Sequence, residues 1–315
     1  MSRLLIVDGH AVIHRAYHSI PKLTSNGQVV NAVYGFYSML LSAIDQLHPK
    51  YVIVCSDSPG PNFRNEEYLG YRSKRSVPDQ DLVRQFPIIE SSLTQSTIPV
   101  FSMGGYEADD LIATLARQAV TKKSKKTKKK FVNLVTIITG DKDLMQLVDR
   151  HTQLLMPVRG LSEIKIITPK EVKQKLNVHP DQVVDLKALM GDSSDSYPGV
   201  QGIGPKGATT LLNKYQNLDN IYRHLDEITP PAKEKLEKGK EDAYLSQKLA
   251  TLVYNVPIHI SLKSAKWDSS KESALLEQFK LFNFKSLINR LQNLNPDLKP
   301  SRSTPSSDPN QGSLF

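Results

Sequence analysis

Two short acidic runs decide how this chain must fold: Met103-Gly104-Gly105-Tyr106-Glu107-Ala108-Asp109-Asp110 and, further along, Thr139-Gly140-Asp141-Lys142-Asp143. If the runs come together, their five carboxylates repel one another, so their charge needs an external counter-charge, and divalent cations are the obvious one. Acids are also favoured in the first turn of any helix, where they cap free N–H groups, and residues 107–120 are predicted to form such a helix. The first run alone leaves both interpretations open.

Composition sets broad limits on the class of protein. The chain has 315 residues, of which 39% are hydrophobic, and its mean hydropathy of -0.36 predicts a globular protein of one large domain or two smaller ones. No apolar run approaches the roughly 20 residues of a membrane span, and Met1-Ser2-Arg3 does not begin a secretory signal, so the cytoplasm is expected. The single cysteine, Cys55, excludes an intrachain disulfide, and the net charge of +9 favours a polyanionic partner.

Apolar runs that alternate with a helical pattern indicate an α/β fold. Strands are predicted at 3–8, 51–57, 99–102 and 134–139, and helical spacing of apolar residues lies between the first two. Continuously apolar strands predict a parallel sheet that is covered by helices on both faces. Sites in such sheets form beyond the carboxyl ends of the strands, where Asp8, Asp57, the 107–110 group, Asp141 and Asp143 all fall. Four strand ends that bring acids to one edge are difficult to explain by helix capping.

Two loops carry concentrated positive charge. The connection after Asp57 contains Phe63-Arg64 and Tyr71-Arg72-Ser73-Lys74-Arg75, a mixture of cations and aromatics suited to a phosphate backbone and its bases, although a solvated loop is the alternative. The lysine-rich segment 122–130 precedes the 134–139 strand, so it is expected at the amino edge, as a solvated insertion with at most a non-specific attraction for DNA.

A helical part of the chain is predicted from residue 168. It opens with the capping box Thr168-Pro169-Lys170-Glu171, and Gly191-Asp192-Ser193-Ser194-Asp195 adds another acid pair. The stretch 198–208 formally contains G-x-G-x-x-G, but no strand precedes it, so a dinucleotide site is rejected. A glycine hairpin between helices instead predicts a site that binds the phosphates of duplex DNA through Gly202, Gly204, Lys206 and Gly207. The composition from residue 295 predicts a disordered tail.

With these motifs in place, the chain closely resembles the bacterial 5′ nuclease family, which comprises the 5′ to 3′ exonuclease domain of DNA polymerase I and its free-standing relatives, kin to flap endonucleases. The resemblance covers roughly residues 3–260. It implies a PIN-like core with a mostly parallel sheet, a helical arch over the site and a C-terminal helix-hairpin-helix variant. Three positions depart from the usual pattern: His10 follows Asp-Gly, Arg72 stands at the usual lysine of the arch, and Ser196-Tyr197 replaces the usual Asn-Ile.

The resemblance implies a role for each motif residue. The family's metal-binding acids correspond to Asp8, Asp57, Glu107, Asp109, Asp110, Asp141, Asp143, Asp192 and Asp195. Asp8, Glu107, Asp109 and Asp110 are expected to build the tighter metal site, and Asp141, Asp143, Asp192 and Asp195 the second, while Asp57 acts directly or through water. Arg64, Arg72, Lys74 and Arg75 are expected to steer the 5′ strand, with Arg72, Lys74 and Arg75 also counted as catalytic. Tyr17 and Tyr71 are candidate stacking residues. His10, beside Asp8, is either a metal ligand or, as we expect, a hydrogen-bonded side chain at the rim of the site.

These roles predict an organisation and a function. Residues 1–167 are expected to form the catalytic core with the arch at about 60–80, and residues 168–294 the DNA-binding region with the hairpin at about 196–215. Two ions of Mg²⁺, with Mn²⁺ as a substitute, and a K⁺ ion at the hairpin are the implied cofactors. The predicted activity is metal-dependent hydrolysis of 5′ flaps, nicks and RNA-primer ends on DNA in replication and repair; the alternative is a non-catalytic, clamp-tethered binder of branched DNA. A ribonuclease on a related sheet is a third hypothesis, which the glycine hairpin, expected for duplex DNA, disfavours.

The end of the chain predicts a partner. Gln311, Leu314 and Phe315 resemble the peptide with which bacterial replication proteins bind the sliding clamp, although Gly312 departs from that peptide. Since no polymerase sequence follows Phe315, a separate DNA polymerase is the expected functional partner. A monomer without membrane association is expected.

Overall fold

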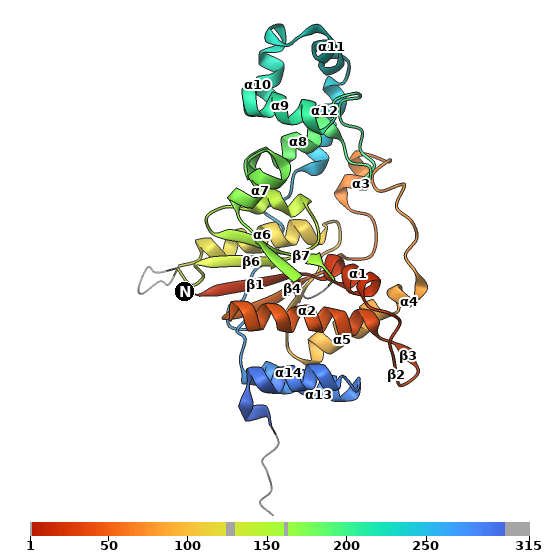
Figure 1. Cartoon of the computed structure of the whole chain (residues 1–315), viewed down its shortest axis with the longest axis vertical. Helices are drawn as coiled ribbons and strands as arrows, with labels where there is room; N and C mark the ends of the chain where they lie inside the picture. Colours follow the sequence, from red (N-terminus) through yellow and green to blue (C-terminus); the bar gives the residue numbers. More distant parts are fainter. Residues whose placement is uncertain (1, 124–129, 161–162, 300–315) are drawn as a thin grey trace, which may run out of the picture.

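The computed structural model describes residues 2–123, 130–160 and 163–299. The molecule is elongated, with a central sheet, the helices α7 to α12 at one end and α13 and α14 at the other (Figure 1). No helix in these described ranges is long and apolar enough to cross a membrane.

The central sheet confirms the predicted parallel architecture. Its six strands run in the order β5-β4-β1-β6-β7-β8, and each neighbouring pair is parallel except β7 with β8. The four predicted strands are present as β1 (Arg3–Asp8), β4 (Tyr51–Cys55), β5 (Val100–Phe101) and β6 (Leu134–Ile138). Two further strands, β7 (Thr152–Arg159) and β8 (Glu163–Ile167), were not predicted. In β8, which lies at the sheet edge, exposed polar residues alternate with apolar ones, so no continuous apolar run marks the strand.

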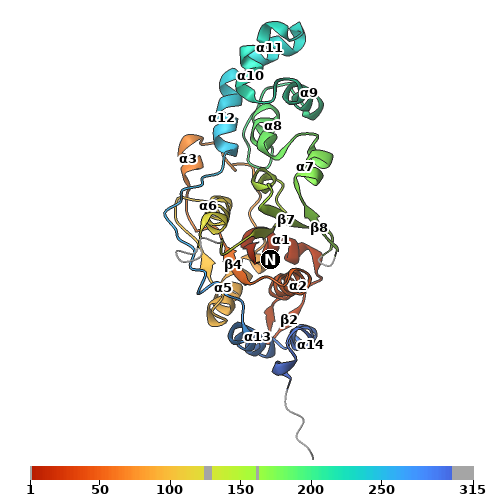
Figure 2. The same cartoon turned by 90° about the vertical axis from the view of Figure 1, so that its left-hand side faces the viewer.

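Helices cover both faces of the sheet, and the alternation of side chains along β1 explains why. Leu4 and Ile6 belong to the core beneath α6 (Ala108–Thr121), whereas Leu5 and Val7 belong to the core beneath α1 (Gly9–Ser19), α2 (Asn31–Leu47) and α5 (Gln85–Gln95). In two perpendicular views α6 lies on one side of the sheet, and α2 and α5 on the other (Figures 1 and 2).

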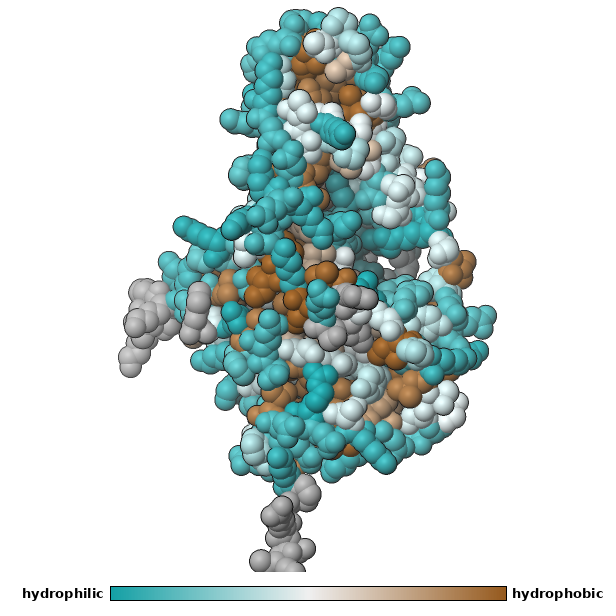
Figure 3. Space-filling model, viewed as in Figure 1, coloured by the Kyte–Doolittle hydropathy of each residue, from teal (hydrophilic) through white to brown (hydrophobic). Residues whose placement is uncertain are grey.

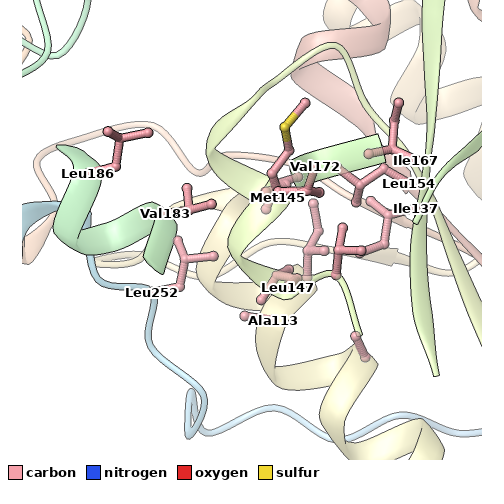
Figure 4. Close-up of a cluster of buried hydrophobic side chains, with 14 of the residues drawn as sticks. Ala113, Ile137, Met145, Leu147, Leu154, Ile167, Val172, Val183, Leu186 and Leu252 are labelled. Atoms are coloured by element: carbon pink, nitrogen blue, oxygen red, sulfur yellow. The ribbon is translucent and has the colours of Figure 1, made fainter. Parts of the chain in front are cut away.

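The helical region shares its core with the sheet. It consists of α7 (Pro169–Leu176), α8 (Val183–Met190), α9 (Pro205–Tyr215), α10 (Leu218–Arg223), α11 (Pro230–Lys238) and α12 (Lys240–Ala250), with short 3₁₀ turns at Pro180–Gln182 and Leu225–Glu227. Val183 and Leu186 of α8 lie in one buried cluster with Met145 and Leu147, from the 3₁₀ turn Asp143–Leu147, and with Ile137 of β6 (Figure 4). This continuous apolar packing fixes the helical region against the sheet.

The chain returns to the sheet region after α12. Lys266 pairs with Tyr51 at the amino end of β4, and α13 (Ser269–Leu281) and α14 (Lys285–Leu294) pack in the same core as α2 and α5. These two helices therefore lie against the core that residues 1–167 were expected to form alone. A last 3₁₀ turn spans Pro296–Leu298, a hairpin of β2 (Thr24–Ser25) and β3 (Gln28–Val29) joins α1 to α2, and residues 300–315 lie outside the described ranges.

The predicted arch is present as a connection between β4 and α5, but little of it is helical. It contains α3 (Phe63–Glu67) and α4 (Gln80–Val83), with turns and extended backbone between them. The expectation of a helical arch is therefore correct only for its two short ends. Most of its side chains from Ser73 to Gln80 are exposed, so packing does not favour a helix there.

The flanks of the lysine-rich segment lie at the amino edge of the sheet, as predicted. Lys123 pairs with Lys130, and the Asn133 N–H donates to the Ser2 carbonyl beside the start of β1. Residues 124–129 are outside the described ranges. The face seen in Figure 3 is hydrophilic over much of its area. Hydrophobic residues gather mainly at the level of the sheet and at the end of the molecule formed by α9 to α11.

Candidate active site

The carboxyl edge of the sheet collects the predicted acids. Because β5, β4, β1 and β6 are parallel neighbours, Asp8, Asp57, the start of α6 and the 139–143 turn all follow strands that end at this edge. The loop 191–195 reaches the same edge from α8, because the shared core holds α8 beside the Asp143–Leu147 turn. The structure thus brings together acids from five separate segments of the chain.

Four of these acids face a large cavity. Asp8, Asp57, Asp109 and Asp141 line a cavity of about 980 Å³. Asp8 caps α1 by accepting from the Ala11 N–H at 3.1 Å, and its other oxygen accepts from the Thr139 hydroxyl at 2.7 Å. Asp57 accepts from the Ala108 N–H at 2.7 Å, at the first turn of α6. Asp8 and Asp57 therefore each bind a free N–H group at a helix start and also line the cavity.

Asp143, Asp192 and Asp195 form a second group. Each offers one carboxylate oxygen, and these atoms lie within 4.8 Å of one another, a spacing that suits a metal ion. Asp192 also organises its own loop, because one of its oxygens accepts from the N–H groups of Ser194 at 2.7 Å and Asp195 at 3.1 Å. We refer to these three residues as the aspartate trio.

Lys187 of α8 is a site residue that the sequence analysis missed. Its ammonium contacts Asp143 and lies 2.5 Å from Asp192. A lysine in the last turn of a helix is ordinarily explained by the helix dipole, so the sequence carried no distinctive signal for this role. The folded structure places it between two acids of the aspartate trio.

Glu107 and Asp110 turn away from the cavity, toward Arg64. The Arg64 guanidinium donates to both oxygens of Asp110, at 2.8 and 2.9 Å, and to Glu107 at 3.0 Å. Its two remaining N–H groups donate to the carbonyls of Leu249 at 2.8 Å and Thr251 at 3.0 Å, at the end of α12. All five donors of this arginine are used.

Arg64 therefore does not have the role predicted from the sequence. The side chain is 1% exposed, so it cannot contact a DNA strand in this structure, and that prediction is wrong. Tyr71 is also buried, at 4% exposure, and its hydroxyl donates to Glu107 at 2.9 Å, so no face is free for stacking. Neighbouring carboxylates drew both side chains inward, a tertiary effect that the local sequence does not contain. Tyr17 is half-buried, and its stacking role stays a prediction.

The remaining cations of the arch border the site. Arg72 contacts Glu107 and lies 3.2 Å from Asp195, and Arg75 lies 2.7 Å from Asp195. The Arg72 N–H also donates to the Asp195 carbonyl at 2.8 Å. Lys74 is exposed and lines the large cavity. The planar guanidinium of Arg72 joins two carboxylates, a geometry that the lysine usual at this position does not reproduce.

Histidines of α1 line the opposite wall. The His10 ring accepts a hydrogen bond from the Asp57 N–H at 3.3 Å, which confirms the predicted hydrogen-bonded histidine at the rim. Its ring centroid lies 4.5 Å from that of Phe86, and His14 lies 5.9 Å from the same ring. His14 and Phe86 also line the cavity, although no sequence motif marks either residue.

Burial and mutual repulsion disturb the ionisation of the acids. The pKa of Asp8 is raised to about 7, mainly by burial and also by the charges of Asp141 and Asp57, although its hydrogen bonds to Thr139 and Ala11 act in the opposite direction. Burial and then Asp141 raise the pKa of Asp143 to about 7, and burial raises that of Asp109 well above its usual range. Burial also opposes ionisation of Asp192, but Lys187 outweighs it and lowers the pKa of this carboxyl to about 2.

The donor set fits divalent cations. All the clustered ligands are carboxylates, which Mg²⁺ and Mn²⁺ prefer. Among the described residues, Asp8, Asp109 and Asp141 have no lysine or arginine within ion-pair distance, and the raised pKa values of Asp8 and Asp109 show that their charge is poorly compensated. A bound cation would supply the missing compensation.

The glycine hairpin lies between α8 and α9, as predicted. Gly202 has a φ of +82°, a left-handed conformation that favours glycine, and Lys206 and Gly207 are exposed in the first turn of α9, which Gly204 caps. Within the described chain, the N–H groups of Lys206 and Gly207 have no acceptor. Free N–H groups at a helix start can bind an anion.

These features define the class of α/β proteins that can hold divalent cations on a carboxylate edge. Residues 3–177 match the family model described as the 5′-3′ exonuclease N-terminal resolvase-like domain, and residues 178–273 match the 5′-3′ exonuclease C-terminal SAM fold. The chain belongs to the 5′-3′ exonuclease family, a family of nucleases, which confirms the resemblance found in the sequence.

Curated relatives agree with this assignment. A protein named 5′-3′ exonuclease from Bacillus subtilis is 31% identical over 299 residues, 93% of this chain and 97% of that protein. DNA polymerase I from Caldicellulosiruptor bescii is 37% identical over 295 residues, 92% of this chain and 33% of that protein. The chain thus spans about a third of the length of the DNA polymerase I relatives that it matches.

Solved structures support the fold. The T5 D15 protein, co-crystallised with metal ions, superposes with a TM-score of 0.62 at 18% identity, covering 95% of this chain and 100% of that one. The catalytic core of Rad2 in complex with DNA substrate superposes with a TM-score of 0.57 at 14% identity, covering 95% and 93%. At these identities the likeness establishes the shared fold.

The buried Arg64 generates a stability prediction. Arg64→Met leaves the Asp110 carboxylate buried without its partner, so the free energy of unfolding should fall by about 3–5 kcal/mol in a denaturant titration. Lys248→Met, which removes the exposed pair with Glu67 on α3, should cost only about 0–1 kcal/mol. The double variant Arg64→Met, Asp110→Leu should recover part of the stability that Arg64→Met loses, because the unpaired charge is gone. If the double variant instead loses the sum of the two single losses, the two residues do not act as a pair.

The raised carboxyl pKa values generate a pH prediction. The folded state binds protons at Asp8 and Asp143 up to about pH 7, whereas the unfolded state releases them near 3.8, the ordinary pKa of an aspartate. Stability of the metal-free protein should therefore fall as pH rises through about 7 and level off once both carboxyls are ionised. Burial also lowers the pKa of His10 and His14 from 6.5. Below about pH 6.5 these two histidines therefore make the stability rise with pH, which opposes the effect of the carboxyls. Melting temperatures in EDTA should thus decline from about pH 6.5 to about pH 8.5, and saturating Mn²⁺ should reduce the decline. A flat profile in EDTA would contradict the burial argument.

Proposed function

We propose that this chain hydrolyses phosphodiesters at 5′ flaps, nicks and primer ends of DNA, with two divalent ions. One observation carries the proposal: acids from separate strands converge on one sheet edge, beside a cavity that Arg72, Lys74 and Arg75 border. Membership of the 5′-3′ exonuclease family supports the reaction class. Clustered acids next to phosphate-binding cations suit hydrolysis of a phosphate ester.

The two acid groups suggest where the ions bind. Asp8, Asp109 and Asp141 would hold one ion and the aspartate trio the other, with Asp57 acting directly or through water. This division differs from the predicted one, because Glu107 and Asp110 bind Arg64. Bound Mg²⁺ or Mn²⁺ would supply an activated water and neutralise the leaving oxygen. Glu107 and Asp110 would support the site by holding the start of α6 and the arch in place.

The arch cations would bind the 5′ strand. Lys74 and Arg75 are exposed at the cavity, so their charges can meet a phosphate backbone, while Arg72 ties the arch to Glu107 and Asp195. The glycine hairpin would hold the adjoining duplex through Lys206 and the free N–H groups of α9. Such contacts recognise backbone and shape, so selectivity for DNA structure over sequence follows.

Several partners and cofactors stay predictions. A K⁺ ion at the hairpin rests on the family resemblance. Gln311, Leu314 and Phe315 lie outside the described residues, so binding to a sliding clamp rests on the sequence motif alone. A monomeric state, a cytoplasmic location and cooperation with a separate DNA polymerase in primer removal are kept as expectations.

Cleavage of a 5′-labelled flap duplex tests the proposal. The wild-type protein should release short 5′ products in Mg²⁺ and none in EDTA. Asp141→Asn keeps the oxygen that accepts from the Asp143 N–H at 2.8 Å, but it removes a charge from the cavity. Its rate should fall at least about a hundredfold, since even residues outside a metal's ligand shell often contribute 10–100-fold.

The controls separate catalysis from binding. Lys280→Ala, on α13 at the far end of the molecule, should cleave at the wild-type rate (Figure 1). Tight flap binding without cleavage in either Mg²⁺ or Mn²⁺ would overturn the catalytic proposal. A non-catalytic binder of branched DNA would then be the better description.

The hairpin generates a prediction about duplex binding. Lys206→Ala should weaken binding of different duplex sequences by a similar factor and reduce the salt slope of the binding constant by about 1, as loss of one phosphate contact requires. Fluorescence anisotropy at several salt concentrations measures both quantities, with Lys280→Ala as the matched surface control. An unchanged slope would exclude a phosphate contact at Lys206.

A further inference from the structure

Tyr197 is tied to the loop that carries two acids of the aspartate trio. Its backbone pairs with that of Asp192 in both directions, at 3.0 and 3.1 Å. Its side chain is 3% exposed and packs with Tyr71, Leu249 and Ala250. The ring is thus buried between the arch, the end of α12 and the acidic loop.

The Tyr197 hydroxyl is buried without a hydrogen-bond partner in the described part of the chain. Buried polar groups are nearly always paired, and an unpaired one costs stability, so each exception calls for an explanation. Tyr71 shows the contrast, because its hydroxyl donates to Glu107 at 2.9 Å. A partner for Tyr197 must therefore come from outside the described protein atoms.

The surroundings of Tyr197 indicate what that partner is. The Lys187 ammonium, which contacts Asp143 and Asp192, lies 6.0 Å from the centre of the Tyr197 ring. Tyr197 therefore lies beside the lysine that joins two acids of the aspartate trio, and its own backbone holds the loop that carries Asp192. A phenol in this position can donate a hydrogen bond.

We propose that the Tyr197 hydroxyl donates a hydrogen bond to an oxygen ligand, either a water or a phosphate oxygen, of the divalent ion that the aspartate trio would hold. This inference rests on the proposed function. Tyr197 is a positioning residue in this arrangement, since it acts on the ion through the oxygen. The family that the sequence resembles usually has isoleucine at this position, which has no donor, so the contact is a feature of this chain.

Thermal unfolding of the full chain tests the inference without measuring activity. In EDTA, Tyr197→Phe should be as stable as the wild type or more stable, because the substitution removes an unpaired buried hydroxyl. In saturating Mn²⁺ its gain in melting temperature should be smaller than that of the wild type, by roughly 2–4 °C. Loss of packing alone would lower both melting temperatures equally, so the difference between conditions reports the hydroxyl.

A matched variant and a second substitution make the test specific. Tyr222→Phe removes a hydroxyl that donates to the Leu236 carbonyl at 3.1 Å in the helical region, and it should change both conditions by the same amount. Asp192→Asn weakens the aspartate trio itself. The Tyr197→Phe difference should disappear in that background, since the two residues act on one ion.

Adding inorganic phosphate identifies the oxygen. A deficit of Tyr197→Phe with Mn²⁺ alone indicates a water, whereas a deficit that appears only with Mn²⁺ and phosphate indicates a phosphate oxygen. If Tyr197→Phe gains as much stability as the wild type in Mn²⁺ alone and also in Mn²⁺ with phosphate, this inference is overturned and the proposed function stands. If the wild type gains nothing from Mn²⁺, the proposed metal sites and this inference are overturned together.

Discussion

Electrostatic repulsion between carboxylates is the constraint on which the rest of this structure depends. Nine acids gather at one edge of the sheet, and burial there makes each uncompensated charge more costly. Arg64, Arg72, Arg75 and Lys187 offset part of this cost by ion pairs with five of the acids. Within the described part of the chain, Asp8, Asp109 and Asp141 at the large cavity have no lysine or arginine partner, which is why this part of the edge is suited to divalent ions.

The same ion pairs connect parts of the chain that are distant in sequence. Arg64 joins the base of the arch to the start of α6 and to two carbonyls at the end of α12, so one side chain fixes three segments. Lys187 joins α8 to the turn after β6. Buried pairs of this kind stabilise the fold little in net terms, because desolvation offsets their attraction, but they make a single arrangement of the segments much more favourable than its alternatives.

Apolar packing provides the rigid support for these charges. Val183, Leu186 and Leu252 share a core with Met145, Leu154 and Ile137, so α8 cannot move independently of the sheet (Figure 4). This shared core places Asp192 and Asp195 beside Asp143 within the reach of one ion. A helical region attached only by a flexible linker would not hold the aspartate trio at that spacing.

The sequence by itself determined the α/β class, the parallel strands β1, β4, β5 and β6, the edge at which their acids meet, the glycine hairpin and the family. These features follow from local apolar periodicity and from topology rules that apply to any parallel sheet. Only the tertiary structure decided how the charges pair. It placed Arg64 and Tyr71 inside, turned Glu107 and Asp110 away from the cavity and brought Lys187 between two acids. It also left the Tyr197 hydroxyl without a partner among the described residues. Pairing depends on distances between residues far apart in the chain, and no local pattern encodes those distances.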